Sequence, residues 1–331
     1  MPNAHFRLSV APMMDWSTTD YRTFARLFHP DVWMYSEMVT TGAIIHGDRR
    51  RHLDFDASEQ PLVLQLGGSN ASELAQCSRI AEDWGYREVN LNVGCPSDRV
   101  QNNKIGACLM AEPELVAECI HAMQQAVSIP VTIKHRIGID QLDSYEHMKH
   151  FVDTVAQTGC QRFIVHARIA LLKGLSPKEN RDIPPLRYED VYRLKQERPD
   201  LIIEINGGFT TVDQVMQQAD HTDGVMIGRA AYHDPYLLAR LGRQQGRSEV
   251  DRFAALEQFY PYMERRLASG LPLSLITRHI LGLFQGEAGA RFWRQSLSGG
   301  NARTLQDVRR AAEGVKERQM AALVSTDTMI N

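Results

Sequence analysis

Cysteine is scarce in this chain, which has only five among its 331 residues. The number is odd and no two cysteines form a CxxC pair, so we expect neither a disulfide framework nor a cysteine zinc site. This usage is typical of a protein that stays in a reducing compartment. We therefore expect a cytoplasmic protein without a metal ion.

Long hydrophobic runs and a strong net charge are also missing. No stretch approaches 18 apolar residues, and residues 1–9 hold no long apolar segment, so we expect neither a membrane span nor a secretory signal. The net charge is −3, which points to no particular partner. Its distribution is uneven, because residues 245–320 carry 12 Lys+Arg against 8 Asp+Glu (12 − 8 = +4), which leaves −7 for the rest. This small basic excess is a slight indication of an anionic partner for the C-terminal part.

Eight short apolar segments, rich in β-branched residues, occupy the first 230 residues. Most are nearly continuous in apolar character, which is typical of parallel strands buried on both faces. Between them lie helical patterns with apolar residues at i, i+3, i+4 and i+7, over 71–85, 113–127, 144–159 and 211–219, and Gly85 and Gly159 supply helix stops. The predicted strands are 8–13, 33–38, 61–66, 88–93, 130–135, 162–167, 201–206 and 224–229.

This alternation predicts a (β/α)8 TIM barrel. A doubly wound sheet is the competing arrangement, but it usually opens with a glycine-rich turn, and here the first strand ends in Ala-Pro-Met-Met. After about Gly246 the strand signal disappears, and helices are predicted over 249–269, 274–286, 288–297 and 303–322. We therefore expect a barrel domain over residues 1–245, a smaller all-helical domain over 246–323 and a flexible tail over 324–331.

Polar and ionisable residues gather where the predicted strands end. Catalytic side chains of barrel enzymes lie at the C-terminal ends of the strands, so this clustering indicates a site. Two of the ends, Asn206-Gly207-Gly208 and Gly228-Arg229, resemble the usual barrel phosphate site, in which glycines allow close approach and an arginine neutralises charge. The other strand ends carry Pro12, Met13, Met14, Gln65, Asn90, Asn92, Cys95, Lys134, Arg136, His166 and Arg168.

Several strand-end residues admit more than one role. Lys134 is compatible with a Schiff-base nucleophile, with a cation beside an electron-rich ring or a phosphate, and with a structural ion pair. His166 is compatible with a site residue or a core histidine. Ala-Pro-Met after the first strand offers a flat apolar surface that could receive a planar heterocycle or belong to the core.

Cys95 lies just past the fourth predicted strand, in a Gly-Cys-Pro-Ser loop. A lone cysteine is more often a small buried residue than a catalyst, but its position at a strand's C-terminal end favours a catalyst. No metal-ligand partners with suitable spacing surround it. A nucleophile would need a nearby base, whereas a proton donor needs only a protonated thiol held over the substrate.

Ordered motifs along nearly the whole chain, from Leu8 to about Met320, resemble the tRNA-dihydrouridine synthase family. The central NxNxGCP and the loop LLKGLSPKENR are its specific features. The matching segments are SVAPMMDWSTTDYR (9–22), VLQLGG (63–68), EVNLNVGCPSDRVQNNKIGACLM (88–110), TIKHRIGID (132–140), FIVHARIALLKGLSPKENRDIPPL (163–186), EINGGF (204–209) and GVMIGRAAYHDPY (224–236).

The resemblance implies a monomeric flavoprotein in which NADPH reduces FMN, and hydride then passes from FMN N5 to C6 of a D-loop uridine at position 20 or 20a. Cys95 would give a proton to C5. The implied FMN contacts are Pro12, Met13, Met14, Gln65, Lys134, His166, Asn206, Gly207, Gly208, Gly228 and Arg229.

A tRNA substrate requires contacts to a base and to phosphates. Asn92 could hydrogen-bond the uracil edge, and basic residues could hold the backbone, although each is equally compatible with a solvated surface. The aromatic residues Phe292 and Trp293 could be core. The basic candidates are Arg168, Lys178, Arg181, Arg291 and Arg294.

Three other functions fit parts of the pattern. A flavin reductase of free pyrimidines would share the barrel and FMN, but would not require the helical domain or the loop over 171–186. A Schiff-base aldolase would use Lys134 and would be colourless. A non-catalytic tRNA-binding protein would not need Cys95, Lys134 and His166.

Overall fold

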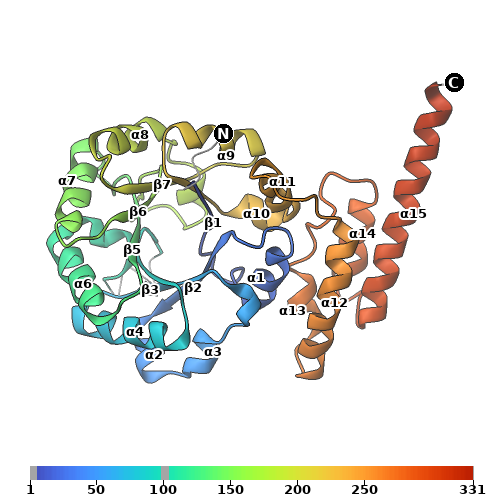
Figure 1. Ribbon diagram of the computed structural model, residues 1–331, viewed down its shortest axis with the longest axis horizontal. Coiled ribbons are helices and arrows are strands. Elements are labelled where there is room, and N and C mark those ends of the chain that lie inside the picture. The colour runs from blue at the N-terminus through green and yellow to red at the C-terminus, as the bar shows by residue number, and fades with distance from the viewer. Residues whose placement is uncertain (1–5, 98–103, 331) are drawn as a thin grey trace. The chain divides into compact units, whose positions relative to one another are not determined.

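A computed structural model describes residues 6–97 and 104–330. Eight parallel strands close into a barrel in the order β1 to β8, with β1 paired to β8, so the predicted (β/α)8 barrel is confirmed (Figure 1). The strands are β1 Arg7–Val10, β2 Trp33–Thr40, β3 Leu62–Gly67, β4 Glu88–Val93, β5 Val131–Arg136, β6 Arg162–His166, β7 Ile202–Asn206 and β8 Gly224–Ile227.

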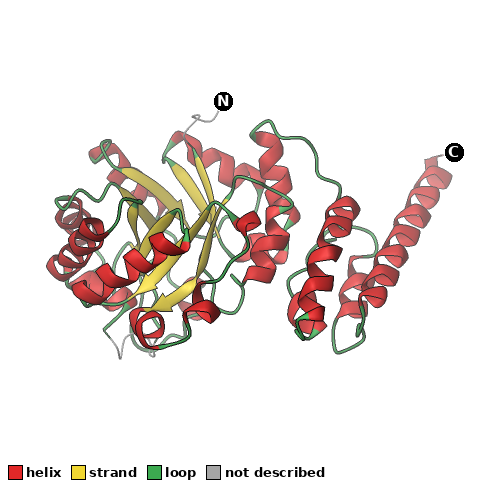
Figure 2. Ribbon diagram, turned by 60° about the horizontal axis from the view of Figure 1, so that its bottom comes forward, coloured by secondary structure: helices red, strands yellow, loops and turns green. Residues whose placement is uncertain are grey.

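The chain packs as two compact units. The first comprises residues 1–17 and 32–228 and contains the barrel, with helices outside the strands (Figure 2). Asn70 caps α4 by accepting from the Glu73 N–H, and Gly85 ends the helix with φ of 97°. The helices of this unit are α2 Thr41–His46, α3 Arg49–Leu53, α4 Ala71–Trp84, α6 Pro113–Ala126, α7 Tyr145–Ala156, α8 Tyr188–Glu197 and α9 Val212–Met216.

Side chains alternate between the inside and the outside of the barrel. Glu88 on β4 pairs with Arg7 on β1, and because these strands are not neighbours, the contact must cross the interior. Two-residue periodicity then places Asn90 and Asn92 inside as well. The interior row of β4 thus contains Asn90 and Asn92, which the sequence placed at the site, and Glu88, which it did not single out.

An apolar cluster fills part of the barrel interior. Tyr35, Val63, Ile164 and Met226 pack together from four different strands, joined by Ala11 just after β1. Such layers of side chains make the centre of a barrel a packed core rather than a pore. Ligands must therefore approach the strand ends, where the predicted site residues lie.

The second unit comprises residues 18–31 and 229–331. This division differs from the expected boundary after residue 245, since the segment with α1 packs against α12. Asp20 accepts from Arg266 Nε at 2.8 Å and from the Tyr262 hydroxyl at 2.7 Å. The helices are α1 Thr19–Arg26, α10 Arg229–His233, α11 Tyr236–Gln244, α12 Arg252–Ala268, α13 Leu273–Thr277, α14 Ala290–Leu297 and α15 Leu305–Ile330.

Two predictions for the C-terminal helices were wrong in extent. The helix expected over 274–286 is confined to α13, and turns follow up to Gly286. At Gly282 a Cβ would lie 2.2 Å from the His233 carbonyl oxygen, so the chain passes too close there for any other residue. The helix expected over 303–322 is longer, since α15 runs to Ile330, and the flexibility of residues 324–331 stays a prediction. Among the described residues, no helix has the length and apolar character needed to cross a membrane.

Candidate active site

The loop after β4 is held on both sides of Cys95. Asn92 Oδ1 accepts from the backbone N–H groups of Gly94 and Cys95, both at 3.0 Å. The Cys95 carbonyl accepts from the Ala107 N–H at 2.9 Å. The backbone is thus fixed while the residue stays partly exposed. The backbone of Gly94 and Cys95 is therefore anchored at the end of β4.

Lys134 and Arg136 form a cationic cluster at the end of β5, beside His166 at the end of β6, which pairs in register with Arg136. Burial, together with Arg136, lowers the pKa of Lys134 to about 7. Burial, followed by the charges of Arg136 and Lys134, lowers the pKa of His166 well below its ordinary value, so this imidazole is neutral at pH 7. Among the residues that the structure describes, the group that opposes the lowering of the Lys134 and Arg136 pKa values is Cys95. Such a site favours an anionic ligand.

Arg136 joins two loops at the mouth. Its Nε donates to the Gly94 carbonyl at 2.9 Å, and its Nη1 donates to the carbonyls of Ile169 and Asn180, both at 2.9 Å. Its side chain is 3 % exposed, and burial lowers its pKa to about 10. The guanidinium therefore ties the Cys95 loop to the segment after β6. The sequence indicates this residue only by its strand-end position, although its spacing of two residues from Lys134 is the signal that it faces the same side of β5.

The glycines after β7 occupy conformations that other residues rarely adopt. Gly207 has φ of 134° and Gly208 has φ of 78°. A Cβ on Gly207 would lie 2.8 Å from Leu186 Cδ2 and 3.0 Å from His166 Cδ2. The turn therefore requires glycine and brings backbone beside His166, as a phosphate or heterocycle site would need.

Asn206 and Gly228 complete the strand ends of the barrel. The Asn206 side chain donates to the Met226 carbonyl at 2.8 Å and so ties β7 to β8. A Cβ on Gly228 would meet only Ala11 Cβ at 3.7 Å and Met13 Sδ at 4.0 Å, so there is room beside this glycine. Arg229, the next residue, begins α10 in the second unit.

The segment after β1 forms a tight turn. The Met13 N–H donates to Ser17 Oγ at 3.0 Å, and the Ser17 N–H returns a bond to the Met13 carbonyl at 2.8 Å. Pro12 and Met13 are partly buried, whereas Met14 is 58 % exposed. An exposed methionine on a fixed turn is available to a flat ligand, as expected for this segment.

Gln65 and Asn92, the predicted flavin and uracil contacts, already bond to each other. Asn92 Nδ2 donates to Gln65 Oε1 at 2.8 Å, and Gln65 Nε2 donates to Asn90 Oδ1 at 2.9 Å. Each terminal amide nitrogen still carries one hydrogen that these bonds do not use. Gln65 and Asn92 can therefore each donate one hydrogen bond to a ligand from the terminal amide nitrogen.

The predicted tRNA contacts fall into two groups. In the first unit, Lys178 and Arg181 are exposed on the segment after β6, and Arg168 donates to the Asp182 and Pro184 carbonyls. In the second unit, Arg291 is exposed on α14, and Arg294 donates to Gln285 Oε1 at 3.0 Å.

The aromatic residues between Arg291 and Arg294 belong to the structure of the second unit. Trp293 is fully buried and donates to the Ile280 carbonyl at 2.9 Å. The Arg318 guanidinium lies 3.7 Å from the centre of the Phe292 ring. Trp293 is therefore a core residue, whereas Phe292 is only partly buried and packs against Arg318.

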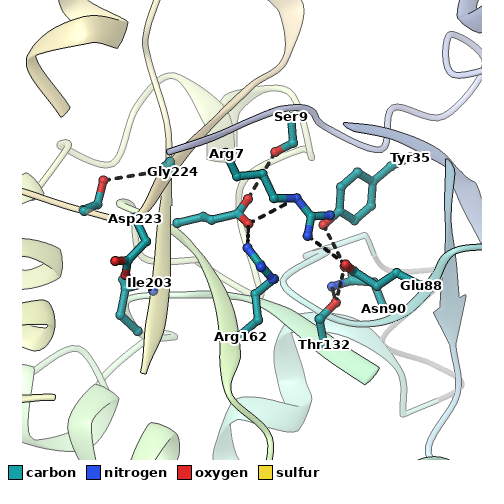
Figure 3. Close-up of polar contacts among 12 residues, drawn as sticks. Arg7, Ser9, Tyr35, Glu88, Asn90, Thr132, Arg162, Ile203, Asp223 and Gly224 are labelled. Carbon is teal, nitrogen blue, oxygen red and sulfur yellow. Dashed lines mark hydrogen bonds and ion pairs between the residues drawn. The ribbon is translucent and has the colours of Figure 1, made fainter. Parts of the chain in front are cut away.

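Sequence reasoning missed a buried ionic network at the other end of the barrel interior (Figure 3). Arg7 pairs with Glu88 at 2.8 Å and with Glu204 at 3.4 Å, and Glu204 also pairs with Arg162. The available signal was a charged residue at the start of each of β1, β4 and β6 and in the middle of β7. His135, by contrast, faces away from the site and packs between Phe151 and Phe163.

Within residues 6–97 and 104–330, no group of three or more His, Cys, Asp or Glu side chains is placed to hold a metal ion. The site can instead bind a planar anion in the cationic cluster and offer the thiol of Cys95 beside it.

The chain was compared with known proteins. Residues 9–319 match the family Dihydrouridine synthase (Dus). The tRNA-dihydrouridine(20/20a) synthase of Synechocystis sp. (strain ATCC 27184 / PCC 6803 / Kazusa) is 57% identical over 294 residues, 88% of each chain. The synthase of the same name from Pseudomonas syringae pv. tomato is 58% identical over 300 residues, 90% of this chain and 89% of the relative.

The fold also resembles that of a solved structure. A 2-naphthoyl-CoA reductase complex superimposes with a TM-score of 0.55 over 72% of this chain and 50% of the other. The sequence identity is 11%, so this likeness supports the barrel fold alone.

Proposed function

Because the chain belongs to the dihydrouridine synthase family of enzymes, we propose that it is an FMN-dependent tRNA-dihydrouridine synthase acting on uridines 20 and 20a of the D-loop. The family match carries this proposal. The cationic site beside Cys95 supports it, because the established family chemistry needs an anionic, electron-rich cofactor and an acid at one place.

The residues at the barrel mouth fit FMN. Its phosphate matches the glycine turn at Gly207 and Gly208 and the open space beside Gly228, where backbone can approach closely. Its ring, which gains negative charge on reduction, matches the buried basic side chains of Lys134 and Arg136, and burial lowers the pKa of each. When bound, FMN would accept hydride from NADPH and supply it to C6 of the uracil.

Cys95 would act as the general acid. Hydride addition at C6 builds enolate-like charge on the uracil, and a proton delivered to C5 quenches that charge. The thiol sits on a backbone fixed by Asn92 and Ala107, so it can be held over one atom of the base. A uridine must leave the tRNA stack to reach a barrel mouth, as bases do in other base-modifying enzymes.

The tRNA backbone would be held by basic residues of both units. Lys178 and Arg181 are exposed on the segment after β6, and Arg291 is exposed on α14. Phosphate contacts of this kind would supply affinity without sequence information. The remaining parts of the proposal are a monomeric state, NADPH as reductant and a cytoplasmic location.

Position mapping in a deletion strain tests the function. Dihydrouridine at positions 20 and 20a should vanish from tRNA when the gene is deleted and return when it is restored. The purified protein should also carry flavin absorbance, whereas a Schiff-base aldolase using Lys134 would be colourless. Reduction of free uracil or orotate by the purified protein, or an unchanged dihydrouridine map, would refute the assignment.

A further inference from the structure

A continuous series of hydrogen bonds, here called the polar relay, runs through the barrel from Glu88 toward Cys95. It begins where Thr132 Oγ1 donates to Glu88 Oε1 at 2.8 Å (Figure 3). Asn90 Nδ2 then donates to Thr132 Oγ1 at 2.9 Å. The relay thus starts deep in the barrel, at a carboxylate that pairs with Arg7.

The polar relay continues to the barrel mouth through two more amides. Gln65 Nε2 donates to Asn90 Oδ1 at 2.9 Å, and Asn92 Nδ2 donates to Gln65 Oε1 at 2.8 Å. It ends where Asn92 Oδ1 accepts the N–H groups of Gly94 and Cys95 at 3.0 Å. Three consecutive interior positions of β4 thereby connect the ionic network to the Cys95 loop.

Each bond of the polar relay has one allowed direction. The Glu88 carboxylate only accepts, so Thr132 must give it the single hydroxyl proton and can offer only a lone pair to Asn90. This turns the nitrogen of Asn90 toward Thr132 and its oxygen toward Gln65. The same reasoning orients Gln65 and then Asn92, whose oxygen must face the backbone N–H of Cys95. A reversed amide would set donor against donor.

Burial makes this order costly to disturb. Glu88, Thr132 and Gln65 are each 1 % exposed, Asn90 is 0 % exposed and Asn92 is 9 % exposed. A buried polar group that loses its partner in such surroundings keeps its desolvation cost, because little water can replace the partner. A change at Thr132 therefore acts on the amides along the relay.

We propose that Thr132 is a positioning residue for Cys95: its hydroxyl sets the amide orientations of the polar relay and thereby the geometry of the Cys95 loop. The turnover measurement that tests this inference rests on the proposed function. The geometry of the Cys95 loop can be tested without it, through the alkylation rate of Cys95. Thr132 itself lies too deep to contact a ligand: it is 1 % exposed, and the three amides of the relay lie between it and the Cys95 loop.

Matched variants test the inference. Thr132→Val keeps the shape and removes the hydroxyl, and Thr132→Ser restores it. Thr222→Val is the control, because Thr222 is also a buried threonine of the first unit, 7 % exposed, whose hydroxyl donates to the Gln218 and Gly224 carbonyls outside the relay. For each flavin-loaded variant we would measure the turnover number on tRNA, the tRNA affinity and the rate of Cys95 alkylation, followed by mass spectrometry of its peptide.

Thr132→Val should lose about tenfold in turnover number, because small displacements of a reacting group are costly. Its tRNA affinity should stay unchanged, and its Cys95 alkylation rate should depart from wild type more than that of Thr222→Val. Thr132→Ser should restore both readouts. Equal losses in all three variants, or wild-type turnover and alkylation in Thr132→Val, would overturn the inference. If the wild type forms no dihydrouridine, the proposed function fails and the alkylation rates alone decide this inference.

Discussion

Removing the Arg136 side chain tests how far activity depends on the anchoring of the Cys95 loop. In Arg136→Met, the carbonyls of Gly94, Ile169 and Asn180 each lose a donor at 2.9 Å. At about 1–2 kcal/mol for each unsatisfied carbonyl, the loss is about 3–6 kcal/mol. The variant also relieves an unfavourable burial of charge, since the pKa of Arg136 is lowered to about 10. That relief is about 3 kcal/mol.

These two effects largely offset each other in the free energy of unfolding. We expect a net destabilisation between about zero and 3 kcal/mol, or a fall in Tm of less than about 10 °C. Turnover should respond far more, because the Gly94 carbonyl is released next to the acid, and misplacement of this kind costs about a hundredfold. Arg136→Met should therefore melt nearly normally and form dihydrouridine slowly.

The assay combines thermal melting with mass spectrometry of dihydrouridine in tRNA. Arg187→Met is the control, because it removes an arginine of the same unit that bonds Asp190 and Asp143 and not the Cys95 loop. Wild-type turnover in Arg136→Met would refute the anchoring role. A fall in the Tm of Arg136→Met far beyond about 10 °C, together with an equal loss of turnover in Arg187→Met, would show that the free energies given above are wrong.

Two further predictions concern ligand binding. Lys134 has a pKa of about 7 in the flavin-free protein, and a bound anion should raise it, so FMN binding should take up a proton. The affinity of the wild type for FMN should be full below pH 7 and should decline as pH rises through the raised pKa of Lys134. The FMN affinity of Lys134→Met should not change with pH. An FMN affinity of the wild type that is independent of pH would contradict this prediction. Replacing Arg291 and Arg294 by Glu should weaken tRNA binding and reduce the slope of log affinity against log salt concentration by about 1–2. The control is replacement of Arg243, which pairs with Glu249 at 3.6 Å, by Glu, and it should change neither quantity. Unchanged tRNA binding of the Arg291 and Arg294 variant at several salt concentrations would exclude both arginines from the interface.

The barrel could be predicted from sequence because its signal is local. Each strand is a short apolar run between helical patterns, and β4, predicted over 88–93, spans Glu88–Val93. The Cys95 loop was found in the same way, from a polar motif at a strand end. What periodicity cannot show is contact between distant strands, so the pair of Arg7 with Glu88 and the polar relay through Thr132 stayed hidden.

Other differences arise from tertiary packing. Nothing local in α1 shows that Asp20 pairs with Arg266, which is 246 positions away, so its place in the second unit could not be foreseen. The end of α13 depends likewise on the close approach of Gly282 to His233. Such contacts override local propensity.

The central claim is that Cys95 protonates the uracil. In a single-turnover experiment, flavin-loaded wild type and Cys95→Ala would be reduced, mixed with tRNA lacking dihydrouridine, and followed by flavin reoxidation and product formation. Cys95→Ala should bind FMN and tRNA normally and react about 10²–10⁴-fold more slowly than wild type. Reaction of Cys95→Ala at the wild-type rate would contradict the acid role.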